Sequence, residues 1–210
     1  MRTRIKICGI TSAEDARMAF DIGADYVGIV LTESPRRVSL DRARAIRAAL
    51  PAEAPVVGVF ADEPPDRVAP VARELGLHAV QVAGWLDHDP EISCDVWHVL
   101  RGAKLPDPPE LPMVPLQTYL LDAHDPSRAG GTGKTADWAW AKRCVVHGRR
   151  LIVAGGLHAG NVEPLILDVR PFGVDASSAL ESEVGKKSPE KVRAFVERIR
   201  AADRVRPKRS

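Results

Sequence analysis

Short apolar runs alternate with longer amphipathic segments along this chain. Eight runs are rich in Val, Ile and Leu and have the length of buried strands. They cover residues 4–8, 26–31, 56–60, 79–82, 96–100, 118–122, 150–154 and 173–176. Between most of them lie segments with the apolar spacing of helices, such as residues 12–23, which open with Ser12 and an acidic first turn, and residues 39–50. This alternation predicts a parallel sheet with crossover helices.

Eight such units in 210 residues favour a closed (β/α)₈ TIM barrel in a single α/β domain over an open doubly wound sheet. The fifth unit is irregular, because prolines crowd the stretch after its strand: Pro106, Pro108, Pro109, Pro112 and Pro115. We therefore expect a proline-rich loop in place of the fifth helix. We expect residues 1–203 to form the catalytic barrel and the basic residues 204–210 to form a disordered C-terminal tail.

Composition restricts the partners and the location of the protein. With 45% hydrophobic and 28% charged residues, the chain has an ordinary globular composition, and its net charge of +2 is too small to indicate a nucleic-acid partner. No apolar run approaches the roughly 18 residues of a membrane helix, and the first residues become charged too early for a secretory signal. Three cysteines form no CxxC pair, as is typical of a reducing compartment. We expect a cytoplasmic protein without membrane or nucleic-acid partners.

The stretch "DPSRAGGTGKTADW" (125–138) resembles a nucleotide-binding loop only superficially. A Walker loop has the pattern GxxxxGK[ST], whose spacing wraps backbone N–H groups around phosphates. Gly133, Lys134 and Thr135 fit this pattern, but Arg128 occupies the position of the first glycine. The glycines therefore need another explanation, and a flexible lid that closes over a bound ligand is one.

The first strand carries a cation and a thiol on one face. In a barrel, the active site lies at the carboxyl ends of the strands. Because side chains alternate, Lys6 and Cys8 share one face and Ile5 and Ile7 share the other, which suits the helix side. Lys6 and Cys8 should then point inward, where the cation would lower the pKa of the thiol and prepare it as a base or nucleophile. A small buried hydrophobe remains the alternative interpretation of Cys8.

Other strand ends add an acid and an anion site. Asp122 ends the sixth strand, either as a cap of the following turn or as an acid beneath the glycine-rich lid. Small residues after the seventh strand (154–157) and the eighth (175–181) predict a phosphate site, because they allow backbone N–H groups to approach an anion. Arg36 follows the second strand and either grips a carboxylate with two hydrogen bonds or lies in solvent.

These residues belong to motifs that span nearly the whole chain. They include "KICGIT" (6–11), "SPRRVS" (34–39), "GGTGKTADW" (130–138), "AGGLHAGNV" (154–162) and "VDASSALE" (174–181). Through them the sequence resembles the phosphoribosylanthranilate isomerases of tryptophan biosynthesis. The combination of the first motif with "GGTGKTADW" and "AGGL" is specific to that family.

The resemblance implies a barrel that needs no metal and no organic cofactor, acting on a small phosphosugar. The implied reaction is an Amadori rearrangement, which converts N-(5-phosphoribosyl)anthranilate into 1-(2-carboxyphenylamino)-1-deoxyribulose 5-phosphate. By similarity, Cys8 is the general base and Asp122 the general acid. The implied substrate-binding residues are Lys6, Arg36 (for the anthranilate carboxylate) and Asp175, and the implied phosphate-binding residues are Gly131, Gly133, Gly155, Gly156, Ser177 and Ser178.

Three functional hypotheses remain open from the sequence. The first is the isomerase itself. The second is a related phosphosugar isomerase with a different aglycone, because Ala83 stands where the family usually has histidine and Ala136 where it has an aromatic residue. The third is a non-catalytic phosphate-binding barrel, which would have no need of Cys8 and Asp122. The sequence also leaves open whether the protein is a monomer or a homodimer, and whether it accepts the analogous aminoaldose of histidine synthesis.

Overall fold

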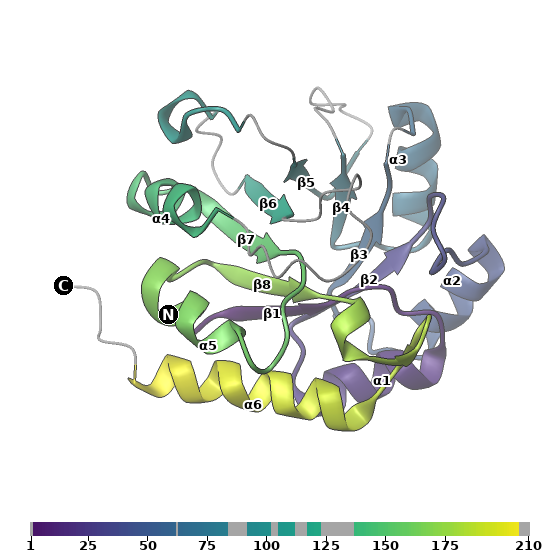
Figure 1. Cartoon of the computed structure of the whole chain (residues 1–210). Coiled ribbons are helices and arrows are strands. Elements are labelled where there is room, and N and C mark those ends of the chain that lie inside the picture. Colours follow the sequence, from purple (N-terminus) through teal and green to yellow (C-terminus); the bar gives the residue numbers. More distant parts are fainter. Residues whose placement is uncertain are drawn as a thin grey trace.

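Eight parallel strands close into a barrel in the computed structural model, which describes residues 2–61, 63–83, 92–101, 105–111, 117–122 and 137–205. The strands follow chain order around the barrel, and the last pairs with the first (Figure 1). Their bounds are β1 (Arg4–Ile7), β2 (Tyr26–Val30), β3 (Val56–Val59), β4 (Ala79–Val82), β5 (Asp95–Leu100), β6 (Thr118–Asp122), β7 (Arg150–Ala154) and β8 (Gly173–Ala176). The predicted TIM barrel and all eight predicted strands are confirmed.

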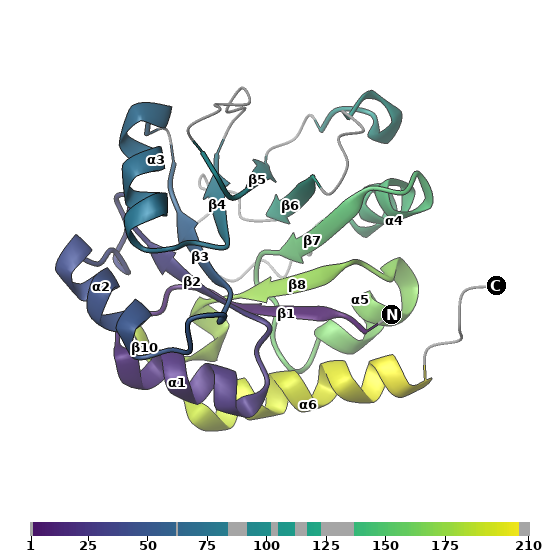
Figure 2. The same cartoon turned by 180° about the vertical axis from the view of Figure 1, so that it is seen from behind.

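Six α-helices cover the outside of the barrel in the described part of the chain (Figure 2). They are α1 (Ala13–Ile22), α2 (Leu40–Ala48), α3 (Pro65–Glu74), α4 (Trp138–Val146), α5 (Val162–Val169) and α6 (Pro189–Val205). Helix α1 begins as predicted, because the Ser12 side chain accepts a hydrogen bond from the backbone N–H of Asp15. It ends at Gly23, whose φ of 118° is readily adopted only by glycine. None of the helices in these residues combines the length and the apolar composition of a membrane span.

Two segments add to or correct what the sequence predicts: the connection between β5 and β6, and the C-terminal end of the chain. Between β5 and β6, the described residues form a short 3₁₀ helix, Pro108–Glu110, while residues 102–104 and 112–116 lie outside the described residues. At the C-terminus, α6 continues to Val205, so the first two residues of the predicted tail are helical, which corrects the boundary. Residues 206–210 lie outside the described residues.

A hairpin between β8 and α6 is the main element that the hydrophobic pattern does not predict. After a short 3₁₀ helix, Ser178–Leu180, the chain forms the antiparallel strands β9 (Glu181–Glu183) and β10 (Lys186–Lys187). Lys187 is paired with Glu181 across this hairpin. The hairpin places two buried charged residues beside the barrel mouth, as described below.

Alternation along the strands separates an outer and an inner core. Ile5 and Ile7 of β1 belong to the large cluster between strands and helices, as the pattern predicts. A second cluster fills the barrel itself, where Tyr26 meets Trp97 edge to face with ring centroids 5.1 Å apart. The inner core is therefore packed with large side chains near the amino-terminal ends of the strands. The opposite end opens into a cavity lined by both polar and apolar side chains.

Asp25 ties the first strand to the last helix at the amino-terminal end of the barrel. Its carboxylate accepts hydrogen bonds from Arg2, from Arg4 of β1 (2.8 Å), from the backbone N–H of Ile5 (3.0 Å) and from Arg200 of α6 (3.0 Å). Burial alone would raise the pKa of Asp25, but these donors outweigh burial and hold the pKa below its ordinary value of 3.8. The hydrogen bonds of Asp25 therefore contribute to the stability of the fold at this end of the barrel.

We expect Asp25→Asn to lower the free energy of unfolding by about 2 kcal/mol at pH 7, because hydrogen bonds to a charged acceptor are lost. Since the pKa of Asp25 is depressed in the folded state, its contribution is present above about pH 4 and is lost as the pH falls through the folded-state value. Urea unfolding at pH 7 and pH 3 measures this, with the exposed Asp21→Asn as the matched control. Equal stability of Asp25→Asn and wild type at pH 7 would contradict the assignment.

Candidate active site

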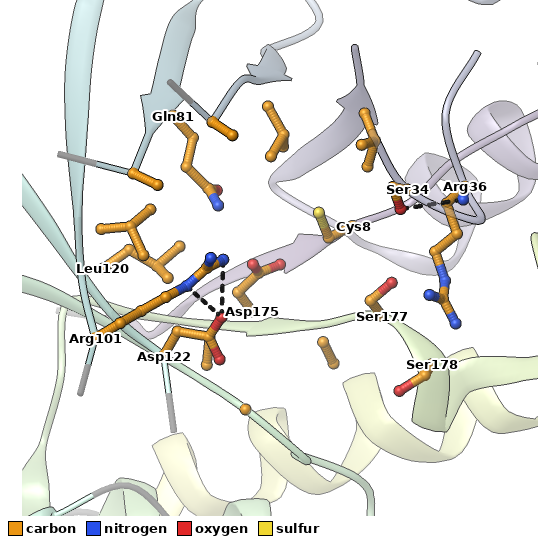
Figure 3. Close-up of a pocket in the computed structure, with 18 of the residues that line it drawn as sticks. Cys8, Ser34, Arg36, Gln81, Arg101, Leu120, Asp122, Asp175, Ser177 and Ser178 are labelled. Carbon is orange, nitrogen blue, oxygen red and sulfur yellow. Dashed lines mark hydrogen bonds and ion pairs between the residues drawn. The ribbon is translucent and has the colours of Figure 1, made fainter. Parts of the chain in front are cut away.

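A cavity of about 380 Å³ opens at the carboxyl ends of the barrel strands. This volume is typical of a site for a small organic ligand. The predicted site residues that line it are Cys8, Arg36, Asp122, Gly155, Gly156, Asp175, Ser177 and Ser178. Figure 3 shows side chains from several strands converging on this space. The structure thus brings together candidates up to 170 positions apart (Cys8 to Ser178).

Two kinds of predicted site residue are not part of this lining. Gly131 and Gly133 lie outside the described residues. Lys6 is fully buried and belongs to the layer next to the cavity, where its Nζ donates to Asp175 Oδ2 over 2.8 Å. Lys6 and Asp175 are register partners across the β1–β8 pair that closes the barrel. Lys6 therefore meets Asp175 rather than the open cavity.

Asp175 has one oxygen engaged and one available. Its Oδ2 accepts from Lys6, while its buried Oδ1 has no hydrogen-bond partner within the described part of the chain. Burial raises the pKa of Asp175, the positive charge of Lys6 acts against this, and the net shift is upward. Asp175 lines the cavity, and its Oδ1 keeps an unused capacity to accept a hydrogen bond.

The thiol of Cys8 has a raised pKa, not a lowered one. Burial raises it most, Lys6 lowers it, and the negative charge of Asp175 raises it again. The expectation that the neighbouring lysine would lower the pKa of this thiol is therefore wrong in its net direction. The main reason is the burial of the thiol, and the negative charge of Asp175 adds to it. Asp175 also keeps the pKa of Lys6 above its ordinary value despite burial.

Asp122 lies at the end of β6 and faces the same cavity as Cys8. Arg101, which follows β5, donates from Nε to Asp122 Oδ2 over 3.2 Å, as the dashed lines in Figure 3 show. The Arg101 side chain is half exposed, whereas Asp122 is mostly buried. The arginine orients the carboxyl group at the cavity wall.

Arg36 is held by a buried carboxylate. Its Nε and Nη2 donate to the two oxygens of Glu181, each over 2.7 Å, and only 20% of the Arg36 side chain is exposed. The alternative that Arg36 lies free in solvent is therefore wrong. A Cβ at Gly9 would lie 2.6 Å from Arg36 Cδ, so this glycine, with a φ of +71°, makes room for the arginine stem.

The turn after β7 has two glycines with left-handed backbone conformations. Gly155 and Gly156 adopt φ values of 87° and 65°, which only glycine takes readily. The Asn161 side chain fixes this turn by donating to the Gly156 carbonyl over 3.0 Å and accepting from the His158 N–H over 2.8 Å. Ser177 and Ser178 follow β8 on the neighbouring edge of the same cavity. Over the described residues, no group of three or more His, Cys, Asp or Glu side chains could hold a metal ion.

Residues 5–198 match the model of a protein family described as N-(5'-phosphoribosyl)anthranilate (PRA) isomerase. The chain belongs to this family. The isomerase of Desulforudis audaxviator (strain MP104C) is 40% identical over 207 residues, covering 95% of this chain and 99% of the relative.

Solved structures of phosphoribosylanthranilate isomerases share the fold over the same length. One, of monomers generated from the dimeric isomerase of Thermotoga maritima, is 34% identical with a TM-score of 0.80 and covers 95% of this chain and 99% of its own. Another, in complex with reduced 1-(o-carboxyphenylamino)-1-deoxyribulose 5-phosphate, is 32% identical with a TM-score of 0.76 and the same coverage.

Four residues in or next to the cavity lining were not singled out as candidates from the sequence. Gly28 in β2 is one, because a Cβ there would lie 2.8 Å from Cys8 Sγ and 3.0 Å from Lys6 Cε. A glycine inside an apolar strand was the available signal. Arg101 was signalled only by its place directly after the fifth strand. Glu181 is the last residue of the motif "VDASSALE", but nothing in that motif separated its role from that of the small residues, and Lys187 lies in a short polar stretch without periodicity.

We expect alkylation of Cys8 by iodoacetamide in the folded protein to have a pH midpoint above 9.0, because only the thiolate reacts and burial with Asp175 raises the pKa of the thiol. Asp175→Asn should lower this midpoint, since it removes a negative charge and leaves Lys6. Peptide-resolved mass spectrometry gives the rates, and the same peptide in the urea-unfolded chain is the reference. A folded-state midpoint at or below the unfolded value would contradict the assignment.

Proposed function

We propose that Cys8 is the general base and Asp122 the general acid of the reaction of this family, which in tryptophan biosynthesis converts N-(5-phosphoribosyl)anthranilate into 1-(2-carboxyphenylamino)-1-deoxyribulose 5-phosphate. The observation that carries the proposal is that both side chains line one cavity, at the ends of β1 and β6. Turns suited to a phosphate border the same space. The arrangement has the size and the groups required for a phosphosugar with an aromatic amine.

The first step is opening of the ribose ring. The departing ring oxygen needs a proton, and the carboxyl group of Asp122 supplies it. Arg101 orients the carboxyl group from the neighbouring strand. Electrons from the anthranilate nitrogen complete a Schiff base at C1′ as the ring bond breaks.

The second step removes the proton from C2′, which the Schiff base makes acidic. The thiolate of Cys8 takes this proton, and the electron pair moves through C1′ to the nitrogen to give an enolamine, which tautomerises to the ketone. A raised thiol pKa makes the thiolate a strong base once it forms, although it is scarce at neutral pH. Asp175 accepts a substrate hydroxyl through its available Oδ1, and Lys6 contributes by holding the other oxygen.

The two ends of the substrate meet different walls. We assign the phosphate to the turns that contain Gly155, Gly156, Ser177 and Ser178, where left-handed glycines expose backbone N–H groups. We assign the anthranilate carboxylate to Arg36. Its Nε edge is occupied by Glu181, so the carboxylate would use the end of the guanidinium that carries Nη1. The assignment of Gly131 and Gly133 to a phosphate-covering loop stays a prediction.

We propose three further properties, which concern the fifth helix, the oligomeric state and the range of substrates. The fifth helix is replaced by a proline-rich loop, which the short 3₁₀ helix at Pro108–Glu110 supports. The protein is a monomer or a homodimer. Ala83 lines the cavity with a small side chain, so tolerance of a modified aglycone is the second candidate property. Ala136 lies outside the described residues.

We expect the purified protein to consume N-(5-phosphoribosyl)anthranilate, followed as a loss of anthranilate fluorescence. The histidine-pathway aminoaldose, offered in a parallel reaction, shows whether the site discriminates between two chemically similar rearrangements. Boiled protein is the control for the spontaneous decay of the substrate. Decay no faster than in that control would remove the activity from this chain.

We expect Cys8→Ala and Asp122→Asn each to lower kcat by about 10²–10⁴, the range for loss of a positioned base or acid. Binding of the reduced product analogue, measured by calorimetry, should remain, because the phosphate and carboxylate contacts are intact. Cys94→Ala, a half-buried cysteine away from the cavity lining, is the matched control for thiol removal. Near-normal turnover in either active-site variant would exclude that residue from its role.

A further inference from the structure

A cluster of three charged side chains forms and supports the assigned carboxylate wall, and two of the three, Glu181 and Lys187, have no role in the mechanism above. It consists of Arg36, Glu181 and Lys187, and we call it the Glu181 triad. We propose that Glu181 is a positioning residue, which fixes the guanidinium of Arg36 so that its free end recognises the carboxylate of the substrate. This inference depends on the proposed role of Arg36 and deepens it.

The hydrogen bonds between Arg36 and Glu181 hold one edge of the guanidinium in a fixed position. Nε donates to Oε1 and Nη2 donates to Oε2 of Glu181, both over 2.7 Å, which is the two-pronged arrangement that fixes an arginine in plane as well as in place. Nη1 has no hydrogen-bond partner among the residues that the structure describes, and Arg36 lines the cavity. The guanidinium thus offers its remaining edge to a second carboxylate, which is the group that distinguishes anthranilate from a plain aromatic amine.

Glu181 is itself held from behind. The fully buried Lys187 donates from Nζ to Glu181 Oε1 over 2.8 Å and to the Ser177 carbonyl over 3.2 Å. The backbone N–H of Lys187 donates to Asp15 of α1 over 3.0 Å. Lys191 of α6 donates to the Glu181 carbonyl over 2.6 Å. The carboxylate therefore cannot follow Arg36 if the arginine moves, so it acts as a fixed support.

The charge balance of the triad favours an incoming anion. Two cations share one carboxylate, and burial leaves little water to screen the excess positive charge. Burial alone would raise the pKa of Glu181, but the hydrogen bonds from Arg36 and Lys187 outweigh it, so the pKa lies below its ordinary value and the side chain stays ionised. A substrate carboxylate at Nη1 would complete a pairing of two cations with two anions.

The stem of Arg36 is confined as well as its head. A Cβ on Gly9 would come within 2.6 Å of Arg36 Cδ and 2.7 Å of Ser177 Oγ, so the arginine passes directly over the backbone of the loop after β1. An arginine held at its stem and along one edge loses little further conformational entropy when it binds a ligand. Preorganisation of this kind raises the selectivity for a carboxylate of fixed position.

The experiment compares two inhibitors that differ only in this carboxylate. One is reduced 1-(2-carboxyphenylamino)-1-deoxyribulose 5-phosphate and the other is its phenylamino counterpart. We expect wild type to bind the carboxylated compound more tightly. Glu181→Gln should reduce that preference about tenfold or more, the scale of one charge-assisted hydrogen bond, while the affinity for the phenylamino compound changes little. A purely structural role would weaken both compounds equally, and that result would overturn the proposal.

Two control variants keep the test decisive. Glu183→Gln lies on the same strand, where the residue forms an exposed ion pair with Lys186 over 3.4 Å, and it should leave the preference unchanged. Glu181→Gln combined with Lys187→Met avoids leaving a buried ammonium without its partner, so it serves if the single variant fails to fold. The preference should be lost in this double variant too, and a preserved preference would overturn the proposal.

A double-mutant cycle separates this inference from the function on which it rests. Arg36→Ala should itself abolish the preference, and adding Glu181→Gln should then have no further effect on it. If Arg36→Ala leaves the preference intact, the assigned role of Arg36 is wrong. If Arg36→Ala removes the preference but Glu181→Gln does not, the role of Arg36 stands and only the positioning role of Glu181 is excluded.

Discussion

The ion pair between Lys6 and Asp175 is the constraint around which the catalytic end of this barrel is organised. It joins β1 to β8 at the seam where the barrel closes, with both side chains buried. Removing two charges from water is costly, and an apolar pair of similar volume would often be at least as stable. Its position beside Cys8 and at the wall of the cavity gives it a use that an apolar pair would not have. Gly28 provides the room that these side chains need.

The same pair shapes the environment of one of the two proposed catalytic groups, and the other group lies in a different environment. Cys8 is buried next to Lys6 and Asp175, whose charges oppose each other, so burial decides the direction in which its pKa moves. Asp122 lies on the other wall, beside the half-exposed Arg101. Cys8 lies at the seam between β1 and β8, and Asp122 lies near the solvent-facing rim, beside Arg101.

Much of this arrangement follows from local pattern, and the rest does not, for identifiable reasons. Strand alternation is sufficient to place Lys6 inward and Ile5 outward, because the period of two is fixed by backbone geometry. The net direction of the Cys8 pKa shift is not accessible in this way. It depends on burial inside the closed barrel and on how Asp175, which is 169 positions from Lys6 along the chain, offsets the charge of that lysine. The hairpin of β9 and β10 escapes prediction because each strand is too short to show a period. Glu181 and Lys187 therefore look like surface residues, although they are buried.

The origin of each side chain suggests how the site divides its tasks. Cys8, Asp122 and Asp175 come from the barrel strands or their immediate ends, where backbone hydrogen bonds on both sides fix their positions. Arg36 comes from a loop, and in our proposal its precision is supplied by a hairpin that the barrel does not require for closure. The proposed acid and base thus lie on the barrel strands, which are the hardest element to change, whereas the proposed recognition of the aglycone depends on a peripheral hairpin. Substitutions in the hairpin can alter which amine is accepted while the proton-transfer geometry stays intact, because the two sets share a cavity but no supporting strand.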